Sequence, residues 1–330
     1  MRKLKNSELE RISVENFKNT NKSIALNHDE IVVAIGIIMK PAPFDYFDPE
    51  SVEEVLHLLH QHGDEAKILA GGQSLGPLLN MRLSTPQIIV DINRVTDLEY
   101  YKSDDTTLKV GAMTRQSTLE DDTNLRTTQP ILAASIPYIG HRSIRNRGTV
   151  GGSVAHADPA AEWPAIMLAL DGALLIRNST SSRTVDASDF YISALTTDLK
   201  PDEILVEIQL PNWVKTSGWS FIEFSRRHGD FAILGVATYL TIENRRCTKS
   251  RIAIIGGGPI PIRASKAESM LIGETISDEL LKDVAEQASK ELDPDSDMHA
   301  SADYRRHLAS VLVSSALQKA ADRAGESGGQ

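Results

Sequence analysis

The chain has 330 residues, 41% of them hydrophobic and 24% charged, a composition typical of an ordinary globular protein with room for more than one domain. Its formal net charge of −10 argues against a broad nucleic-acid surface, because such a surface needs clustered Lys and Arg. The single cysteine, Cys247, excludes an intrachain disulfide framework, a four-cysteine zinc site and an iron–sulfur cluster held only by this chain's thiolates. No apolar stretch reaches the roughly 18 residues of a membrane span, and one cysteine fits a reducing compartment, so we expect a cytoplasmic protein without a membrane span.

The N-terminal part of the chain differs in composition from the rest. Residues 1–38 are polar, mixed in charge and rich in Asn, and are predicted to form a flexible lead-in. The apolar run at residues 31–39 lies too far from the N-terminus for a signal peptide and lacks a small-residue cleavage site. The sequence MKPAPFDYFDP from Met39 looks like a fresh start, so we expect the working domain to begin there.

From Pro41 onward, helical and strand patterns alternate. Residues 49–62 carry apolar side chains at helical spacing and stop at Gly63, which predicts an amphipathic helix. Runs of β-branched residues then predict short strands between helices as far as Pro211. The strands are expected at residues 67–70, 87–92, 107–111, 173–177 and 204–210, and the helices at residues 114–121, 131–136 and 164–170.

A break at residues 211–218, where Pro-Asn-Trp is shortly followed by Ser-Gly, predicts a domain boundary. Strands come first beyond it and helices afterwards, an order typical of an α+β domain. The strands are expected at residues 219–226, 234–243 and 249–256, and the helices at residues 278–292 and 302–324. The predicted organisation is a lead-in at 1–38, a first domain at 39–214, a second at 215–325 and a disordered tail at 326–330.

Two glycine-rich stretches are the most informative features of the sequence. The first is LAGGQSLGPLLNMRL, residues 69–83, and the second is IRNRGTVGGSVAHADPAAEWPA, residues 144–165. Paired glycines permit positive φ and a close approach of the backbone, and consecutive N–H groups can form a concavity that suits a phosphate oxygen. One such loop could be only a turn. Two of them, each followed by Ser and an apolar residue, predict a ligand with an extended diphosphate.

Together with a third motif, FSRRHGDFAILGVA at residues 224–237, the two loops resemble the FAD-binding (medium) subunit of the molybdenum hydroxylase and xanthine dehydrogenase family. That family includes the medium chain of carbon monoxide dehydrogenase and the flavin subunits of bacterial N-heterocycle (nicotine-type) dehydrogenases. The resemblance runs from about Met39 to the C-terminal helices. It implies an α+β fold, in which a PCMH-type FAD-binding domain of two α/β subdomains precedes a smaller C-terminal domain of antiparallel sheet and helices.

The resemblance implies FAD-binding residues in both loops and just after the second. Backbone amides of the first loop would surround the diphosphate, with the Ser74 hydroxyl as a further donor. Asp158 lies in the following turn, and Glu162 is where the family often has an acidic residue near the flavin's sugar chain. The implied FAD-binding residues are Ala70, Gly71, Gly72, Gln73, Ser74, Leu75, Thr149, Val150, Gly151, Gly152, Ser153, Asp158 and Glu162.

Residues around these loops invite further hypotheses. A cluster of three arginines (Arg142, Arg145 and Arg147) precedes the second loop, where it could balance the diphosphate charge or face a partner subunit. Ile222 and Glu223 stand where some relatives have a flavin-contacting Lys. The triple glycine at 256–258 is expected to be a turn, because Pro follows at once where a helix should open. We expect no metal ligands and no catalytic residue in the usual sense.

The resemblance also implies a division of labour between subunits. The chain would be an FAD-containing oxidoreductase subunit that takes electrons from iron–sulfur clusters and passes them to a terminal acceptor. Molybdopterin would lie in a large partner subunit and two-iron two-sulfur clusters in a small one, in a heterotrimer or a dimer of heterotrimers. An N-heteroaromatic compound is the favoured substrate of the complex.

Two other hypotheses remain open on the sequence alone. One is a self-contained FAD-dependent oxidoreductase of the PCMH superfamily, which would show substrate activity as an isolated chain. The other is a scaffold subunit that has lost its cofactor, against which the intact glycines of both loops argue.

Overall fold

The computed structural model describes residues 40–214 and 216–327, which divide into two compact units. The smaller unit comprises residues 40–42 and 78–85, in which Arg82 Nε donates to Lys40 O at 3.1 Å. The larger unit comprises residues 43–77 and 86–327 and holds every sheet of the described chain. Both glycine loops belong to this larger unit.

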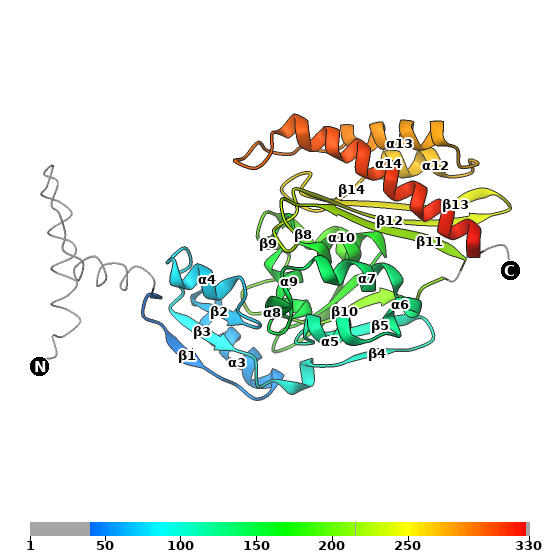
Figure 1. Ribbon diagram of the computed structural model, residues 1–330. Coiled ribbons are helices and arrows are strands. Elements are labelled where there is room, and N and C mark those ends of the chain that lie inside the picture. Colours follow the sequence, from blue (N-terminus) through cyan, green and yellow to red (C-terminus); the bar gives the residue numbers. More distant parts are fainter. Residues whose placement is uncertain (1–39, 215, 328–330) are drawn as a thin grey trace, which may run out of the picture. The chain divides into compact units, whose positions relative to one another are not determined.

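The first layer of the larger unit is a parallel sheet with strand order β1-β3-β2. Its strands are β1 (Asp45–Phe47), β2 (Ala66–Leu69) and β3 (Ile88–Asp91), and the helix α3 (Val52–His62) packs on it (Figure 1). The buried face of α3 and both faces of β3 are apolar, as expected for a covered parallel strand. The first glycine loop leaves this sheet directly after β2 and enters the helix α4 (Leu75–Asn80).

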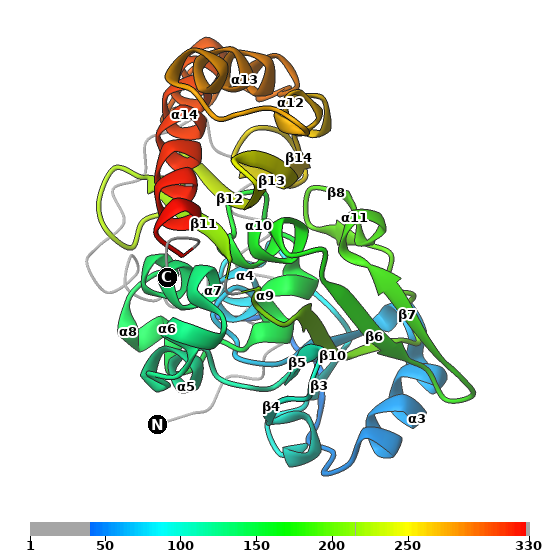
Figure 2. The same cartoon turned by 90° about the vertical axis from the view of Figure 1, so that its right-hand side faces the viewer.

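The second layer is an antiparallel sheet with strand order β4-β5-β10-β6-β7. Its central strand, β10 (Ile204–Pro211), pairs with β5 (Thr107–Gly111) on one side and β6 (Ala173–Arg177) on the other. The outer strands are β4 (Tyr101–Ser103) and β7 (Ser182–Asp186). Figure 2 shows this sheet beside helices α5 to α9.

Short helices cover this second sheet, and the second glycine pair, Gly151 and Gly152, lies in the first turn of one of them rather than in a loop. They are α5 (Gln116–Asp121), α6 (Leu125–Thr128), α7 (Pro130–Ser135), α8 (Arg142–Arg145), α9 (Val150–His156), α10 (Glu162–Ala169) and α11 (Ala187–Phe190), followed by the strands β8 (Tyr191–Ser193) and β9 (Thr196–Thr197). All residues of α10 are buried, because the helix lies between the second sheet and the C-terminal one.

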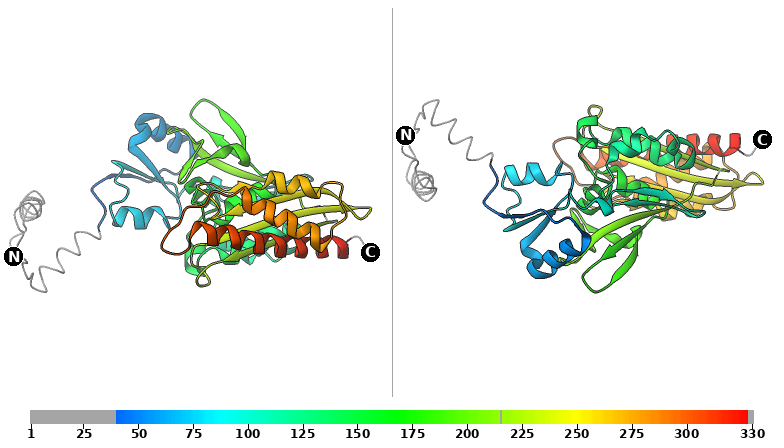
Figure 3. Two further views of the ribbon diagram at one scale, coloured as in Figure 1. Left: turned by 90° about the horizontal axis from the view of Figure 1, so that it is seen from above. Right: turned by 90° about the horizontal axis from the view of Figure 1, so that it is seen from below.

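The C-terminal layer is an antiparallel sheet with strand order β11-β12-β13-β14. Its strands are β11 (Ser217–Phe224), β12 (Leu234–Glu243), β13 (Arg246–Ile255) and β14 (Ile262–Arg263), and its helices are α12 (Ser265–Leu271), α13 (Asp278–Lys290) and α14 (Ala302–Ser327). The helices cover one face of this sheet and α10 covers the other, as Figures 1 and 3 show. This double cover explains why β12 is buried at eight successive positions. No helix of the described residues is long and apolar enough to cross a bilayer.

The structure confirms the predicted α+β fold. The predicted elements differ from the observed ones at their ends, whereas short elements such as β1, β7, α9 and α12 were not predicted. Helix α3 starts at Val52 rather than at residue 49, because the Ser51 side chain accepts a hydrogen bond from Glu54 N and caps it. Strand β13 starts at Arg246, since Asn244 and Arg245 both have positive φ and close a tight turn after β12. Helix α14 continues to Ser327, so the first residues of the expected tail are helical. The lead-in at 1–38 and residues 328–330 lie outside the described residues.

We predict that Gly218→Ala lowers the free energy of unfolding by about 1–3 kcal/mol. An added methyl group on β11 would collide with the Ala320 carbonyl oxygen and lie 2.7 Å from Ala324 N on α14. Gly325→Ala on the same helix is the matched control, because its new Cβ meets nothing within 4 Å. Helix propensity predicts a gain of up to about 1 kcal/mol there. Urea unfolding followed by circular dichroism measures the free energy of unfolding of both variants. An unchanged midpoint for G218A would contradict the close packing of β11 on α14.

Candidate functional site

The two glycine loops lie against each other. We call residues 70–75 loop 1 and residues 149–153, which form the N-cap and first turn of α9, loop 2. A Cβ added at Gly71 would collide with the carbonyl oxygen of Arg147 and come within 2.8 Å of Gly148 Cα. A Cβ added at Gly152 would lie 3.5 Å from Ala70 Cβ. Gly71 therefore lies against the backbone of Arg147 and Gly148, directly before loop 2, and only glycine fits at position 71.

Loop 1 presents a row of backbone donors. No residue in the described part of the chain accepts a hydrogen bond from the N–H groups of Gly71, Gly72, Gln73 or Ser74. Gly72 has φ +72°, the left-handed conformation that lets successive amides turn toward one point. Backbone donors are rarely left without an acceptor. Four consecutive ones therefore indicate an anion-binding concavity of the kind that holds phosphate oxygens.

The peptide planes of loop 1 are held from behind. Asn93 Nδ2 donates to the Ala70 carbonyl at 2.8 Å, and Gln73 Nε2 donates to the Gly71 carbonyl at 3.1 Å. In a trans peptide the carbonyl and the next N–H point in opposite directions. These two bonds therefore turn the Gly71 and Gly72 N–H groups away from Asn93 and Gln73, toward the open side of the loop.

Loop 2 contributes differently, because its amides already have acceptors. The bonds are Val150 N to Thr114 O (3.0 Å), Gly151 N to Ala112 O (2.8 Å), Gly152 N to Thr149 Oγ1 (3.1 Å) and Ser153 N to Thr149 O (3.1 Å). Thr149 thus caps α9, and Gly151 lies directly on Ala112 at the end of β5. A ligand could therefore contact loop 2 through its glycine backbone, which has no side chains in the way, and through the Ser153 hydroxyl.

The three arginines before loop 2 have separate roles. Arg142 pairs with Asp121 at 2.6 Å, and Arg145 pairs with Glu120 at 2.7 Å. Arg145 is buried and also donates to main-chain carbonyls, so it holds the segment before loop 2 in place. Arg147 is exposed and has no carboxylate partner among the described residues. Of the three, only Arg147 keeps a charge available for a diphosphate or a partner.

Arg115, which sequence reasoning missed, joins both loops. Its Nη1 donates to the Arg147 carbonyl at 2.5 Å, and its Nη2 donates to Asn93 Oδ1 at 2.7 Å. The guanidinium is half-buried with no carboxylate in contact in the described structure. Burial and the charge of Arg147 lower the pKa of Arg115 below its ordinary value, although an arginine stays protonated. The signal in the sequence was an arginine just after a strand, which alone points to no role.

The acidic residues after loop 2 lie in a buried region. Asp158 Oδ1 accepts from Ala160 N at 2.8 Å, and Glu162 is 7% exposed at the start of α10. No hydrogen bond joins either carboxylate to loop 1 or loop 2 in the described residues. Burial, with a smaller effect from Asp158, raises the pKa of Glu162 to about 7. Burial and the charge of Glu162 raise the pKa of Glu223, on β11, to about 9, and Glu223 Oε2 has no partner in the described structure.

Other sequence features have a structural explanation. The expected turn at 256–258 is present, with Gly256 at φ +73° and its N–H donating to Pro159 O at 2.9 Å. Cys247 is fully buried, and burial raises the pKa of its thiol to about 11. The described residues contain no group of three or more His, Cys, Asp or Glu that could hold a metal ion.

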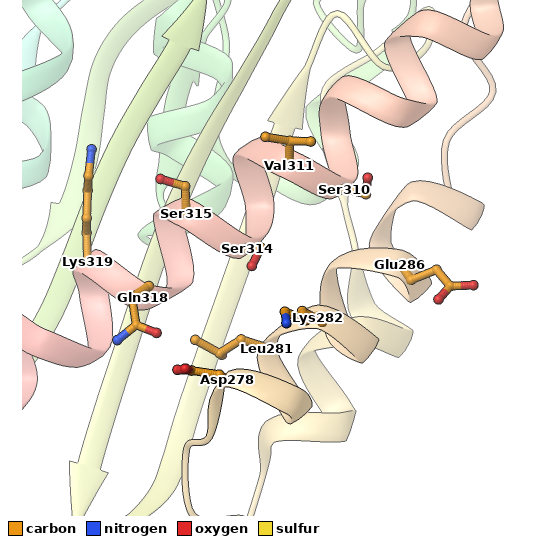
Figure 4. A pocket seen from close by; sticks show the side chains of 10 residues that line it. All are labelled: Asp278, Leu281, Lys282, Glu286, Ser310, Val311, Ser314, Ser315, Gln318 and Lys319. Carbon is orange, nitrogen blue, oxygen red and sulfur yellow. The ribbon is translucent and has the colours of Figure 1, made fainter.

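A groove of about 930 Å³ lies between α13 and α14 (Figure 4). Most of its lining side chains are polar, among them Ser310, Ser314 and Gln318, and Leu281 and Val311 are apolar. None of the buried unpaired polar atoms of the described residues belongs to its lining. The helices that form it cover the face of the C-terminal sheet opposite α10. The chemistry therefore points to the glycine loops and not to this groove.

Residues 42–213 match the family model for the FAD binding domain in molybdopterin dehydrogenase, and residues 219–320 match the model for the CO dehydrogenase flavoprotein C-terminal domain. The chain belongs to this family of FAD-binding medium subunits. Subunit alpha of the 6-hydroxypseudooxynicotine dehydrogenase complex of Paenarthrobacter nicotinovorans is 43% identical over 87% of this chain and 97% of that protein. Subunit beta of caffeine dehydrogenase from Pseudomonas sp. (strain CBB1) is 39% identical over 86% of this chain and 97% of that protein.

Solved structures of the family share the fold of this FAD-binding subunit. A chain of carbon monoxide dehydrogenase from Hydrogenophaga pseudoflava has a TM-score of 0.84 at 34% identity, covering 86% of this chain and 99% of that one. A chain of quinoline 2-oxidoreductase from Pseudomonas putida 86 has a TM-score of 0.82 at 37% identity, covering 87% and 99%. Each match covers 99% of the solved chain, so the shared fold extends over nearly the whole of that chain.

We predict that Glu223→Gln makes the stability of this subunit less dependent on pH. The folded chain keeps the Glu223 carboxyl protonated up to about pH 9, whereas the unfolded chain ionises it near 4.5. Stability is therefore lost as pH rises from about 4.5 toward about 9. Relative to wild type, E223Q is expected to gain at least about 1.4 kcal/mol between about pH 5 and about pH 8.

Urea unfolding at several pH values measures this difference. The exposed Glu279→Gln, which removes a surface carboxyl in the same way, is the matched control. A flat difference for E223Q would show that Glu223 is not held in the buried, protonated form.

Proposed function

We propose that this subunit binds FAD across loops 1 and 2 and carries electrons between a partner subunit and a terminal acceptor. The observation that carries the proposal is the row of four unpaired N–H groups in loop 1, set directly against loop 2. Family membership supports FAD as the ligand that these donors receive.

Each group of residues has a definite part in this proposal. The amides of Gly71 to Ser74 would donate to the diphosphate oxygens, with Ser153 Oγ a further donor from loop 2. The whole implied set, residues 70–75 and 149–153 with Asp158 and Glu162, would line the diphosphate and the adjoining sugar chain. The charge of Arg147 would offset the negative diphosphate.

FAD, when bound, supplies chemistry that links one-electron donors to two-electron acceptors. The protein would fix its position, exclude water from part of it and set the local charge. Burial raises the pKa of Glu162 to about 7 and that of Glu223 to about 9, which would leave that region less negative than its composition suggests.

The partners that we propose are a large molybdopterin-binding subunit and a small iron–sulfur subunit. One related protein is named as a subunit of a dehydrogenase complex, and one related solved structure is named as a Cu,Mo-CO dehydrogenase. A single cysteine cannot hold the clusters, so they would lie in another chain. A heterotrimer, or a dimer of heterotrimers, follows.

An N-heteroaromatic compound is the substrate class that we propose for the complex. Two of the relatives are named for caffeine and quinoline, and both compounds are N-heteroaromatic. The hydroxylated substrate would bind in the large subunit, so nothing in loops 1 and 2 selects it. A self-contained oxidoreductase would instead oxidise substrate as an isolated chain, and a cofactor-free scaffold would bind no flavin.

We predict that Gly71→Ala removes most of the bound flavin. The new methyl group would push loop 1 away from the Arg147 carbonyl and turn its amides out of line. Gly76→Ala, just beyond loop 1 in α4, is the control, because nothing lies within 4 Å of its added Cβ. Absorbance near 450 nm per chain measures flavin content. Full flavin content in G71A would contradict a diphosphate site at the loop contact.

We predict that the flavin is reduced by substrate only within the assembled complex. The chain would be purified alone and also co-purified with its two partners, and each sample mixed anaerobically with quinoline or caffeine. Bleaching of flavin absorbance is expected only in the complex, because electrons arrive through the partner's clusters. Bleaching of the isolated chain would favour the self-contained oxidoreductase, and a complex without flavin would favour the scaffold.

A further inference from the structure

The connection between the loops depends on one side chain that touches neither the open face of loop 1 nor any carboxylate of the described residues. Arg115 follows β5 and pairs with Thr149 through an isolated antiparallel bridge. Its guanidinium lies between Asn93, which follows β3, and the Arg147 carbonyl, which precedes loop 2. It therefore joins the parallel sheet that carries loop 1 to the segment that carries loop 2.

Arg115 also sets which way the Asn93 amide points. A guanidinium can only donate, so the Asn93 oxygen must face it. The Asn93 nitrogen is then left to donate to Ala70 O at 2.8 Å and to Asp91 Oδ1 at 2.5 Å. Without Arg115 the amide could turn over and present its oxygen to the Ala70 carbonyl, which is repulsive. The orientation of the Ala70–Gly71 peptide, and of the Gly71 N–H with it, depends on this relay.

The second bond of Arg115 holds the other side of the loop contact. The Arg147 carbonyl that accepts from Nη1 is the same atom with which a Cβ at Gly71 would collide. One guanidinium thus fixes both the Arg147 carbonyl and, through Asn93, the peptide that faces it. A lysine has the charge but not the planar fork, so it cannot hold both acceptors in one geometry.

We propose that Arg115 is a positioning residue, which acts through Asn93 and the Arg147 carbonyl to hold loops 1 and 2 at the spacing that a diphosphate requires. This inference rests on the proposed FAD function. It assigns a role in ligand affinity to two residues, Arg115 and Asn93, whose side chains point behind the donor row.

The test is the affinity of flavin-free protein for FAD, measured by quenching of flavin fluorescence. Arg115→Met and Arg115→Lys are each expected to raise the Kd by at least about tenfold, because each breaks the two-acceptor geometry. Asn93→Ala should raise it by a similar factor. The double variant R115M/N93A should be little worse than either single variant, since both break the same relay.

The outcomes distinguish a positioning role of Arg115 from an effect of its charge and from a general loss of folding. If Arg115 acted by charge alone, R115K would bind as wild type does, and the effects of R115M and N93A would multiply. Either result would overturn the proposal. Thermal unfolding of the flavin-free variants reports whether they fold, and if R115M does not fold, R115K and N93A carry the test.

The same titration separates this proposal from the proposed function. If the wild-type chain binds no FAD, both the proposed function and this inference are contradicted. If the wild-type chain binds FAD tightly and the Kd values of R115K and N93A are within about twofold of the wild-type value, only this inference is contradicted.

Discussion

The contact between Gly71 and the Arg147 carbonyl is the constraint on which the rest of the site depends. It joins a loop that ends a parallel sheet to a loop that starts a helix beside an antiparallel sheet. Because the contact is backbone against backbone, no side chain can adapt to an error in spacing. The elements behind it must therefore be rigid, and the buried ion pair of Arg145 with Glu120 and the backbone bonds from loop 2 to Thr114 and Ala112 provide that rigidity.

The two loops divide the work of holding a diphosphate. The N–H groups of residues 71–74 in loop 1 have no acceptors in the described residues. Those of residues 150–153 in loop 2 already donate to Thr149, to Thr114 and to Ala112 at the end of β5. Unpaired amides are costly where water is excluded, and a ligand that pairs them stabilises the fold as it binds. The same loop geometry thus ties flavin affinity to the stability of the folded chain.

Sequence reasoning located the loops but not what holds them. Paired glycines, strand patterns and helix periods are local, and they predicted most elements and the order of the two glycine stretches. Asn93 and Arg115 reach the site only through pairing of distant strands, so no local pattern indicates them. The ion pairs of Arg142 and Arg145 with Asp121 and Glu120, and the burial of Glu162 against the C-terminal sheet, are likewise products of packing. Sequence alone left all three arginines as equal candidates, and packing leaves only Arg147 without a carboxylate partner among the described residues.

The most direct test of the central claim is the flavin released by acid from the purified wild-type chain, identified by chromatography and counted per chain. A diphosphate site across two loops predicts FAD, close to one per chain, or uptake of added FAD to that ratio. A colourless protein that takes up no FAD would contradict the account. Release of a flavin with only one phosphate would contradict it as well, since such a ligand cannot use both loops.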